Sequence, residues 1–175
     1  MEIGQALTLI REVPDFPSQG ILFQDITPLL SHPEAFSSVT RALSDLDQSA
    51  NIVAGIEARG FILGSAIALH RSTGFVPVRK KGKLPHKTIS RPYGLEYGHD
   101  EIEIHQDAFE AESNVLVVDD VLATGGTLEA ALHLISSTGA QISSVVVLLE
   151  IQELEGRKRI LQSFPHLVIH SLVLA

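Results

Sequence analysis

The chain has 175 residues, of which 13 are lysine or arginine and 21 are aspartate or glutamate, so its formal net charge is −8. This length is typical of one domain, and a composition of 45% apolar and 19% charged residues excludes an intrinsically disordered protein. The absence of cysteine excludes disulfides and thiol nucleophiles, and no apolar run approaches the ~18 residues of a membrane span. Since no signal peptide is visible at the N-terminus, we expect a cytoplasmic protein that contacts no membrane.

The first 50 residues are predicted to be partly helical. An apolar stripe predicts a short helix over residues 2–12, and a second amphipathic helix is expected over residues 33–46, with proline in its first turn. Between them, prolines and glycines punctuate residues 13–30, so an irregular packed segment is expected there.

From residue 51 onward, strands and helices alternate. The predicted strands are 51–56, 75–79, 115–118, 144–149 and 167–174, and the predicted helices are 60–71, 127–136 and 154–161. This alternation predicts an α/β fold with a mainly parallel central sheet that is flanked by helices. Ligands of such folds bind beyond the carboxyl ends of the strands.

Residues 80–114 show a weaker pattern, in which only residues 101–104 alternate as a short exposed strand. A long segment without regular structure is often functional, so we expect a flexible lid over about residues 84–104. Six of the 13 basic residues lie between positions 79 and 91. Charge alone favours a solvated basic loop here, with binding of one small polyanion as the alternative, and the net acidic charge argues against a nucleic-acid partner.

The most specific motif is VVDDVLATGGT at residues 117–127, in which a buried strand runs into two carboxylates, a glycine turn and a helix. The N–H groups and the dipole of a helix N-terminus bind anions, and glycines let the backbone approach a ligand closely. Because carboxylates repel phosphate, we expect Asp119 and Asp120 to bind sugar hydroxyl groups or a metal-bearing substrate beside the anion. The alternative is that one carboxylate caps the turn while the other is solvated.

This motif resembles the phosphoribosyl-pyrophosphate (PRPP) motif of the type I phosphoribosyltransferases. PDFPSQGILFQDITPLL at residues 14–30, GIEARGFILG at 55–64, VRKKGKLP at 78–85 and YGLEYG at 93–98 narrow the resemblance to the adenine phosphoribosyltransferases. The resemblance covers roughly residues 13–150. It implies one domain over residues 1–175 with the type I fold, including a small N-terminal hood of about residues 1–35. It also implies a purine-salvage enzyme that converts adenine and PRPP to AMP and pyrophosphate.

The resemblance also implies which residues form the site around PRPP. The 5′-phosphate is expected at Ala123, Thr124, Gly125, Gly126 and Thr127, and the ribose hydroxyls at Asp119 and Asp120. The pyrophosphate is expected at Arg59, Arg79, Lys80 and Lys83. A cis peptide is expected in the Arg59 loop, at Ala58–Arg59. The basic segment can reach a neighbouring subunit's site in this family, so a homodimer is expected.

The remaining site residues are implied in the same way. Arg59, Glu96 and Tyr97 are expected to be catalytic, and Leu22, Phe23 and Gln24 to bind adenine. Mg²⁺ is the expected cofactor, carried by PRPP without direct protein ligands. Two alternatives stay open: a phosphoribosyltransferase for xanthine, hypoxanthine or guanine, because Gln24 stands where the family often has a basic residue, and a PRPP-sensing regulator without catalysis.

Overall fold

The structure is a computed structural model that describes residues 1–94 and 100–175, and the chain divides into two compact units. The first unit is Met1–Ala42. It contains α1 (Ile3–Leu7), β1 (Arg11–Pro14), β2 (Leu22–Asp25), α2 (Thr27–Ser31) and most of α3 (Pro33–Asp45). No helix of the described residues is long and apolar enough to cross a membrane.

Two predictions for this unit are wrong. The helix expected over residues 2–12 ends at Leu7, because the residues that follow pair with β2 in an antiparallel ribbon. An ion pair of 2.5 Å between Arg11 and Asp25 joins the two strands of that ribbon. Residues 13–30, expected to be irregular, contain all of β2 and most of α2, which has a proline in its first turn. Pairing with a partner strand outweighs the local helical pattern here.

The second unit, Leu43–Ala175, contains a seven-stranded sheet in the order β5-β6-β4-β3-β7-β8-β9. The strands are β3 (Ile52–Ile56), β4 (Gly74–Lys80), β5 (Thr88–Tyr93), β6 (Asp100–His105), β7 (Asn114–Leu122), β8 (Gln141–Glu150) and β9 (Ile169–Leu174). Neighbouring strands in the row β4, β3, β7, β8 and β9 pair in parallel. Strands β6 and β5 extend the sheet beyond β4 with antiparallel pairing. The predicted α/β fold with a mainly parallel sheet is confirmed.

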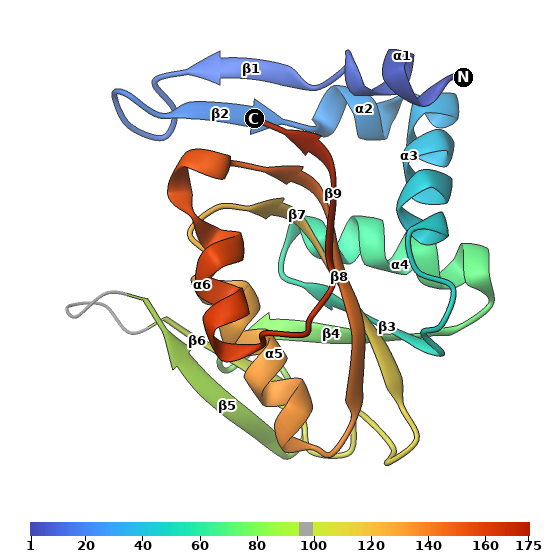
Figure 1. The fold of residues 1–175 in the computed structure, drawn as a ribbon, viewed down its shortest axis with the longest axis vertical. Coiled ribbons are helices and arrows are strands. Elements are labelled where there is room, and N and C mark those ends of the chain that lie inside the picture. Colours follow the sequence, from blue (N-terminus) through green and yellow to red (C-terminus); the bar gives the residue numbers. More distant parts are fainter. Residues whose placement is uncertain (95–99) are drawn as a thin grey trace. The chain divides into compact units, whose positions relative to one another are not determined.

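The helices of this unit are α4 (Arg59–Arg71), α5 (Gly126–Ser137) and α6 (Gly156–Ser163), with a short 3₁₀ turn at Gln152–Leu154 before α6. Helix α4 connects β3 to β4, whereas α5 connects β7 to β8 in the opposite direction along the sheet. Connections between parallel strands are right-handed, so two that run in opposite directions place their helices on opposite faces of the sheet. Figure 1 shows α4 on one side of the sheet and α5 with α6 on the other. The strand order therefore reverses between β3 and β7, the point at which such sheets bind ligands.

The antiparallel hairpin of β5 and β6 was only partly predicted. The expected exposed strand at residues 101–104 is wrong in its exposure, because Ile102, Glu103 and Ile104 are all buried. Strand β6 pairs with β4 on one side and β5 on the other, so it is an interior strand of the sheet. Much of the predicted lid is thus regular sheet.

Candidate active site

The carboxyl ends of β3 and β7 bring two loops to the point where the strand order reverses. After β3, two residues lead directly into α4, which begins at Arg59. After β7, Ala123, Thr124 and Gly125 form a short turn into α5, which begins at Gly126. The strand predicted to end at Val118 continues to Leu122, so Asp119 and Asp120 lie on the strand itself.

The turn between β7 and α5, called the phosphate loop below, encloses a small cavity. The cavity has a volume of about 80 Å³ and is lined by Asp119, Val121, Ala123, Thr124, Gly125, Gly126, Thr127 and Leu128. Gly125 is in the left-handed conformation with φ of 78°, and no side chain caps the helix that follows. Since the first-turn N–H groups of a helix have no intrahelical acceptor, this cavity has the donors that an anion requires.

Gly156, which no sequence motif singles out, packs directly against the phosphate loop. A Cβ atom on Gly156 would lie 2.1 Å from the carbonyl oxygen of Ala123 and 2.9 Å from the nitrogen of Gly125. Conversely, a Cβ on Gly125 would lie 2.7 Å from the Gly156 carbonyl oxygen. The start of α6 and the phosphate loop are therefore in direct backbone contact, which a side chain at either position would prevent.

The two carboxylates of β7 differ in their partners. Asp120 is buried, and its Oδ2 lies 2.8 Å from Nε of Arg59. Asp119 Oδ1 accepts the Asp120 backbone N–H at 2.9 Å. Burial and the neighbouring Asp120 carboxylate raise the pKa of Asp119. Burial also raises the pKa of Asp120, and the positive charge of the Arg59 guanidinium offsets part of that rise. The two neighbouring carboxylates thus differ in environment: Asp120 pairs with Arg59, whereas Asp119 is held against the backbone of β7.

The Arg59 loop lies close against β7. A Cβ on Gly60 would lie 2.8 Å from the Val118 carbonyl oxygen and 3.0 Å from Asp119 Oδ1. A non-proline cis peptide occurs in this loop at Glu57–Ala58, so its predicted position at Ala58–Arg59 is wrong by one residue.

The predicted pyrophosphate residues of β4 are organised by Glu57, which the sequence did not single out. Glu57 Oε2 accepts from Arg79 Nε at 3.2 Å and from the Lys80 backbone N–H at 3.0 Å. The Arg79 guanidinium also lies 5.8 Å from the ring centre of Phe61. Its Nη1 donates to the carbonyl oxygen of Lys83 at 3.2 Å. The loops after β3 and β4 are therefore connected through one carboxylate and one guanidinium.

The three residues predicted to bind adenine, Leu22, Phe23 and Gln24, belong to β2 of the first unit. The ring centres of Phe23 and Phe16 are 5.1 Å apart, in an edge-to-face contact. Glu96 and Tyr97 lie outside the described residues. The described residues contain no group of three or more His, Asp or Glu side chains that could hold a metal ion.

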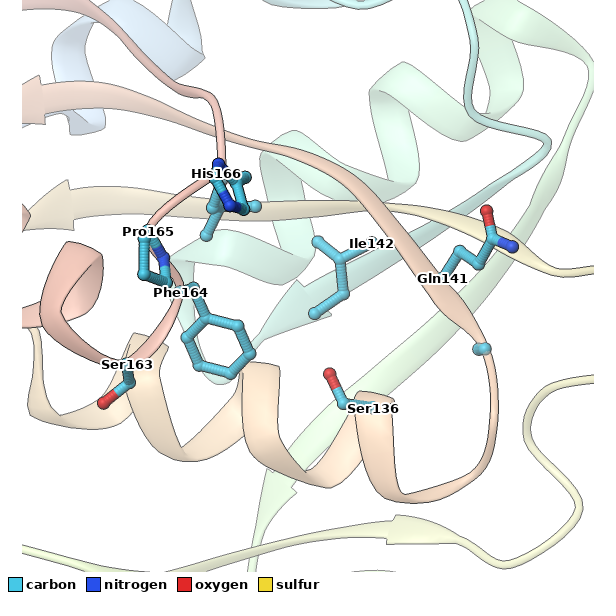
Figure 2. A pocket seen from close by; sticks show the side chains of 9 residues that line it. Ser136, Gln141, Ile142, Ser163, Phe164, Pro165 and His166 are labelled. Atoms are coloured by element: carbon cyan, nitrogen blue, oxygen red, sulfur yellow. The ribbon is translucent and has the colours of Figure 1, made fainter.

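A larger cavity lies at the other end of α5. Figure 2 shows its lining, which includes Ser136 of α5, Ile142 of β8 and Phe164 after α6, and its volume is about 460 Å³. It opens at the amino end of β8, whereas parallel α/β sheets bind ligands at the carboxyl ends. Its lining contains no charged carboxylate, lysine or arginine, so the phosphate loop is the better candidate site despite its smaller cavity.

Residues 25–166 match the family model described as phosphoribosyl transferase domain. The chain is 51% identical over 156 residues to the adenine phosphoribosyltransferase of Streptomyces clavuligerus, with 88% of each chain covered. The solved adenine phosphoribosyltransferase of Thermoanaerobacter pseudethanolicus is similar with a TM-score of 0.91, 42% identity and 99% of both chains covered. That of Saccharomyces cerevisiae, solved with D-2,5-dideoxy-2,5-imino-altritol 1,6-bisphosphate and adenine, has a TM-score of 0.89, 35% identity and 97% coverage of both chains.

Proposed function

Because the chain belongs to the phosphoribosyl transferase domain family and, within it, to the adenine phosphoribosyltransferases, we propose that it converts adenine and PRPP to AMP and pyrophosphate in purine salvage. The observation that carries this proposal is the cavity of the phosphate loop, with the Arg59–Asp120 pair beside it. An anion site next to paired carboxylates and an arginine suits a substrate that has a phosphate, a ribose and a pyrophosphate in sequence.

The reaction is a displacement at the anomeric carbon of PRPP. The bond from this carbon to the pyrophosphate oxygen breaks, and its electron pair leaves with pyrophosphate. A new bond forms to a ring nitrogen of adenine, which loses its proton. The phosphate loop holds the 5′-phosphate, while Asp119 and Asp120 accept hydrogen bonds from the ribose hydroxyls. Arg59 and Arg79, with Lys80 and Lys83, stabilise the charge that develops on pyrophosphate, which lowers the barrier to its departure.

The proposal includes roles for the residues away from the phosphate loop. Leu22, Phe23 and Gln24 bind adenine, with the Phe23 ring stacking on the base. Glu96 and Tyr97 act at the reacting atoms, Glu96 by stabilising the oxocarbenium-like transition state or by handling the proton of the base. These assignments rest on the sequence motifs that carry the family resemblance.

Mg²⁺ is proposed to enter as part of the PRPP substrate, where it neutralises pyrophosphate charge. This fits a site whose described residues offer paired carboxylates and a cation to the substrate. We also propose a cytoplasmic homodimer, because the basic segment around Lys83 resembles one that reaches a neighbouring subunit. Light scattering of the purified protein checks the dimer.

One assay tests the proposed function. The purified protein is incubated with PRPP, Mg²⁺ and, separately, adenine, hypoxanthine, guanine or xanthine, and the nucleotide formed is measured. AMP formation with adenine strongly preferred is the expected result. Turnover of another base instead would assign a different purine, and PRPP binding without any turnover would identify a regulator.

The Asp120→Asn variant is expected to lower kcat/KM for PRPP by roughly tenfold to a hundredfold. The amide keeps the size of the side chain but removes the charge that pairs with Arg59 at 2.8 Å and replaces one acceptor by a donor. Steady-state kinetics with varied PRPP measure the effect. Asp107→Asn, at an exposed turn residue, is the matched control. Unchanged PRPP kinetics in a folded Asp120→Asn protein would remove Asp120 from the site.

A further inference from the structure

Glu103 of β6 is a buried carboxylate that the proposed reaction does not use. Glu103 is only 3% exposed to solvent, and it lies in the middle of a strand that pairs with β4 and β5. A buried carboxylate is costly unless several donors satisfy it, so its partners indicate what it holds in place.

The partners of Glu103 are the backbone groups of the loop that follows β4. Its Oε1 accepts the N–H of Lys83 at 2.9 Å and the N–H of Leu84 at 3.0 Å. Burial by itself would raise the pKa of Glu103, but hydrogen bonds from Leu84, the Thr88 hydroxyl, Lys83 and Gly82 lower it, so the group is a carboxylate at neutral pH. Successive N–H groups around one anion form a nest that fixes the path of the loop.

The same loop also binds the side chain of Arg79, which lies on β4. In the antiparallel register of β4 and β6, Arg79 lies directly opposite Glu103. Nη1 of Arg79 donates to the carbonyl oxygen of Lys83, the residue whose N–H binds Glu103. Nε of Arg79 donates to Glu57 at the end of β3. A continuous set of contacts thus runs from Glu103 through the loop backbone to Arg79 and on to Glu57.

Resting on the proposed function, we propose that Glu103 is a positioning residue for pyrophosphate: it holds the Lys83 loop so that Arg79 and Lys83 lie in place for the leaving group. Glu103 itself contacts neither substrate nor the reacting atoms. Its carboxylate accepts the N–H groups of Lys83 and Leu84 and so fixes the backbone of the loop after β4. That backbone carries the Lys83 side chain, and its Lys83 carbonyl oxygen binds the Arg79 guanidinium. Fixing these cationic side chains before the reaction avoids reorganisation as charge develops on pyrophosphate.

The test compares Glu103→Gln with the wild-type full-length protein in both directions of the reaction. The amide replaces one accepting oxygen by a donor that faces the loop N–H groups. The KM values for PRPP and for pyrophosphate are expected to rise roughly tenfold, while the KM for AMP, which lacks pyrophosphate, changes less than about twofold. Amide hydrogen exchange is expected to become faster at Lys83 and Leu84 and to stay unchanged in α5.

Glu101→Gln is the matched control, because Glu101 lies two residues away on the same face of β6 but pairs with Lys81 at 2.6 Å near the surface. It is expected to leave all three KM values within about twofold. If Glu103→Gln fails to fold, Glu103→Asp is measured instead, because it keeps the charge on a shorter side chain. The same result is then expected: a larger rise of the KM for pyrophosphate than of the KM for AMP.

Two results would overturn this role for Glu103: an unchanged KM for pyrophosphate in a folded variant, or equal rises of the KM values for AMP and pyrophosphate. The second result would identify a general structural effect. Failure of the proposed function is distinguishable, since in that case the wild-type protein itself forms no nucleotide from adenine and PRPP.

Discussion

Replacing Gly156 by alanine is expected to lower kcat/KM for PRPP by about a hundredfold or more, although Gly156 contacts no proposed substrate atom. A Cβ at this position would lie 2.1 Å from the Ala123 carbonyl oxygen and 2.8 Å from the Leu122 side chain. The first of these contacts is with backbone, so the added methyl group can be accommodated only if the phosphate loop or the start of α6 moves.

The required movement is large compared with what catalysis tolerates. Real Cβ atoms essentially never approach within 3.0 Å of another heavy atom, so a shift of roughly 1 Å is needed, and a displacement of that size costs on the order of a hundredfold in rate. Gly156 lies in an ordinary helical conformation, outside the positive-φ glycines, so the effect is steric. Alanine at Gly125 would add backbone strain to the steric clash, because Gly125 has φ of 78°.

The measurement is steady-state kinetics with varied PRPP, together with thermal unfolding. Gly4→Ala is the matched control, because α1 also holds a helical glycine and a Cβ there meets nothing within 4 Å. The control is expected to keep wild-type kinetics. A Gly156→Ala protein with wild-type PRPP kinetics would contradict the contact between α6 and the phosphate loop.

The contrast between Gly156 and Gly125 shows what the sequence could predict about the site. Gly125 belongs to a contiguous motif that includes a strand, two carboxylates and a helix start, so its environment was predictable from neighbours in the chain. Gly156 contacts the phosphate loop and Glu103 binds the N–H groups of Lys83 and Leu84, in each case 19 or more positions away, through contacts that exist only once α6 and the β5–β6 hairpin are packed. Single-sequence patterns contain no signal for such pairs.

In the fold, too, elements with a local sequence pattern were predictable and elements that depend on distant pairing were not. The parallel strands were predictable because continuous apolar runs such as 115–118 and 145–149 are buried on both faces. The ribbon of β1 and β2 was not predictable, since its pairing residues have no such pattern and each strand is only four residues long. Strand β5 was also missed, because Pro92 within it argues against a strand unless it lies at a sheet edge, as β5 does.

The second large effect is on stability and concerns Asp47, in the turn after α3. Its carboxylate is buried and accepts hydrogen bonds from the Ser49 N–H at 2.7 Å, the Ala50 N–H at 3.2 Å, and the hydroxyls of Ser143 and Ser144 on β8. This single side chain therefore joins the turn before β3 to β8, two strands away in the sheet.

Asp47→Ala is expected to lower the free energy of unfolding at pH 7 by about 3 kcal/mol, because it leaves buried and partly buried donors without their acceptor. A chain of this size should then lose roughly 6–12 °C in Tm. Denaturant and thermal unfolding measure both quantities. Asp45→Ala, at an exposed position on the last residue of α3, is the control and should stay within about 0.5 kcal/mol of wild type.

The same variant has a pH signature that separates a charge effect from lost packing. Burial opposes ionisation of Asp47, but the hydrogen bonds from Ser143, Ser144 and Ser49 outweigh it and hold the pKa below its usual range. A carboxyl whose pKa is lower in the folded state stabilises the fold fully above its unfolded pKa of about 3.9 and loses that stabilisation as pH falls further. The difference in unfolding free energy between wild type and Asp47→Ala should therefore be constant from pH 5 to 7 and shrink below about pH 4. A difference that stays constant down to pH 2.5 would mean that the ionised carboxylate is not what joins the turn to β8.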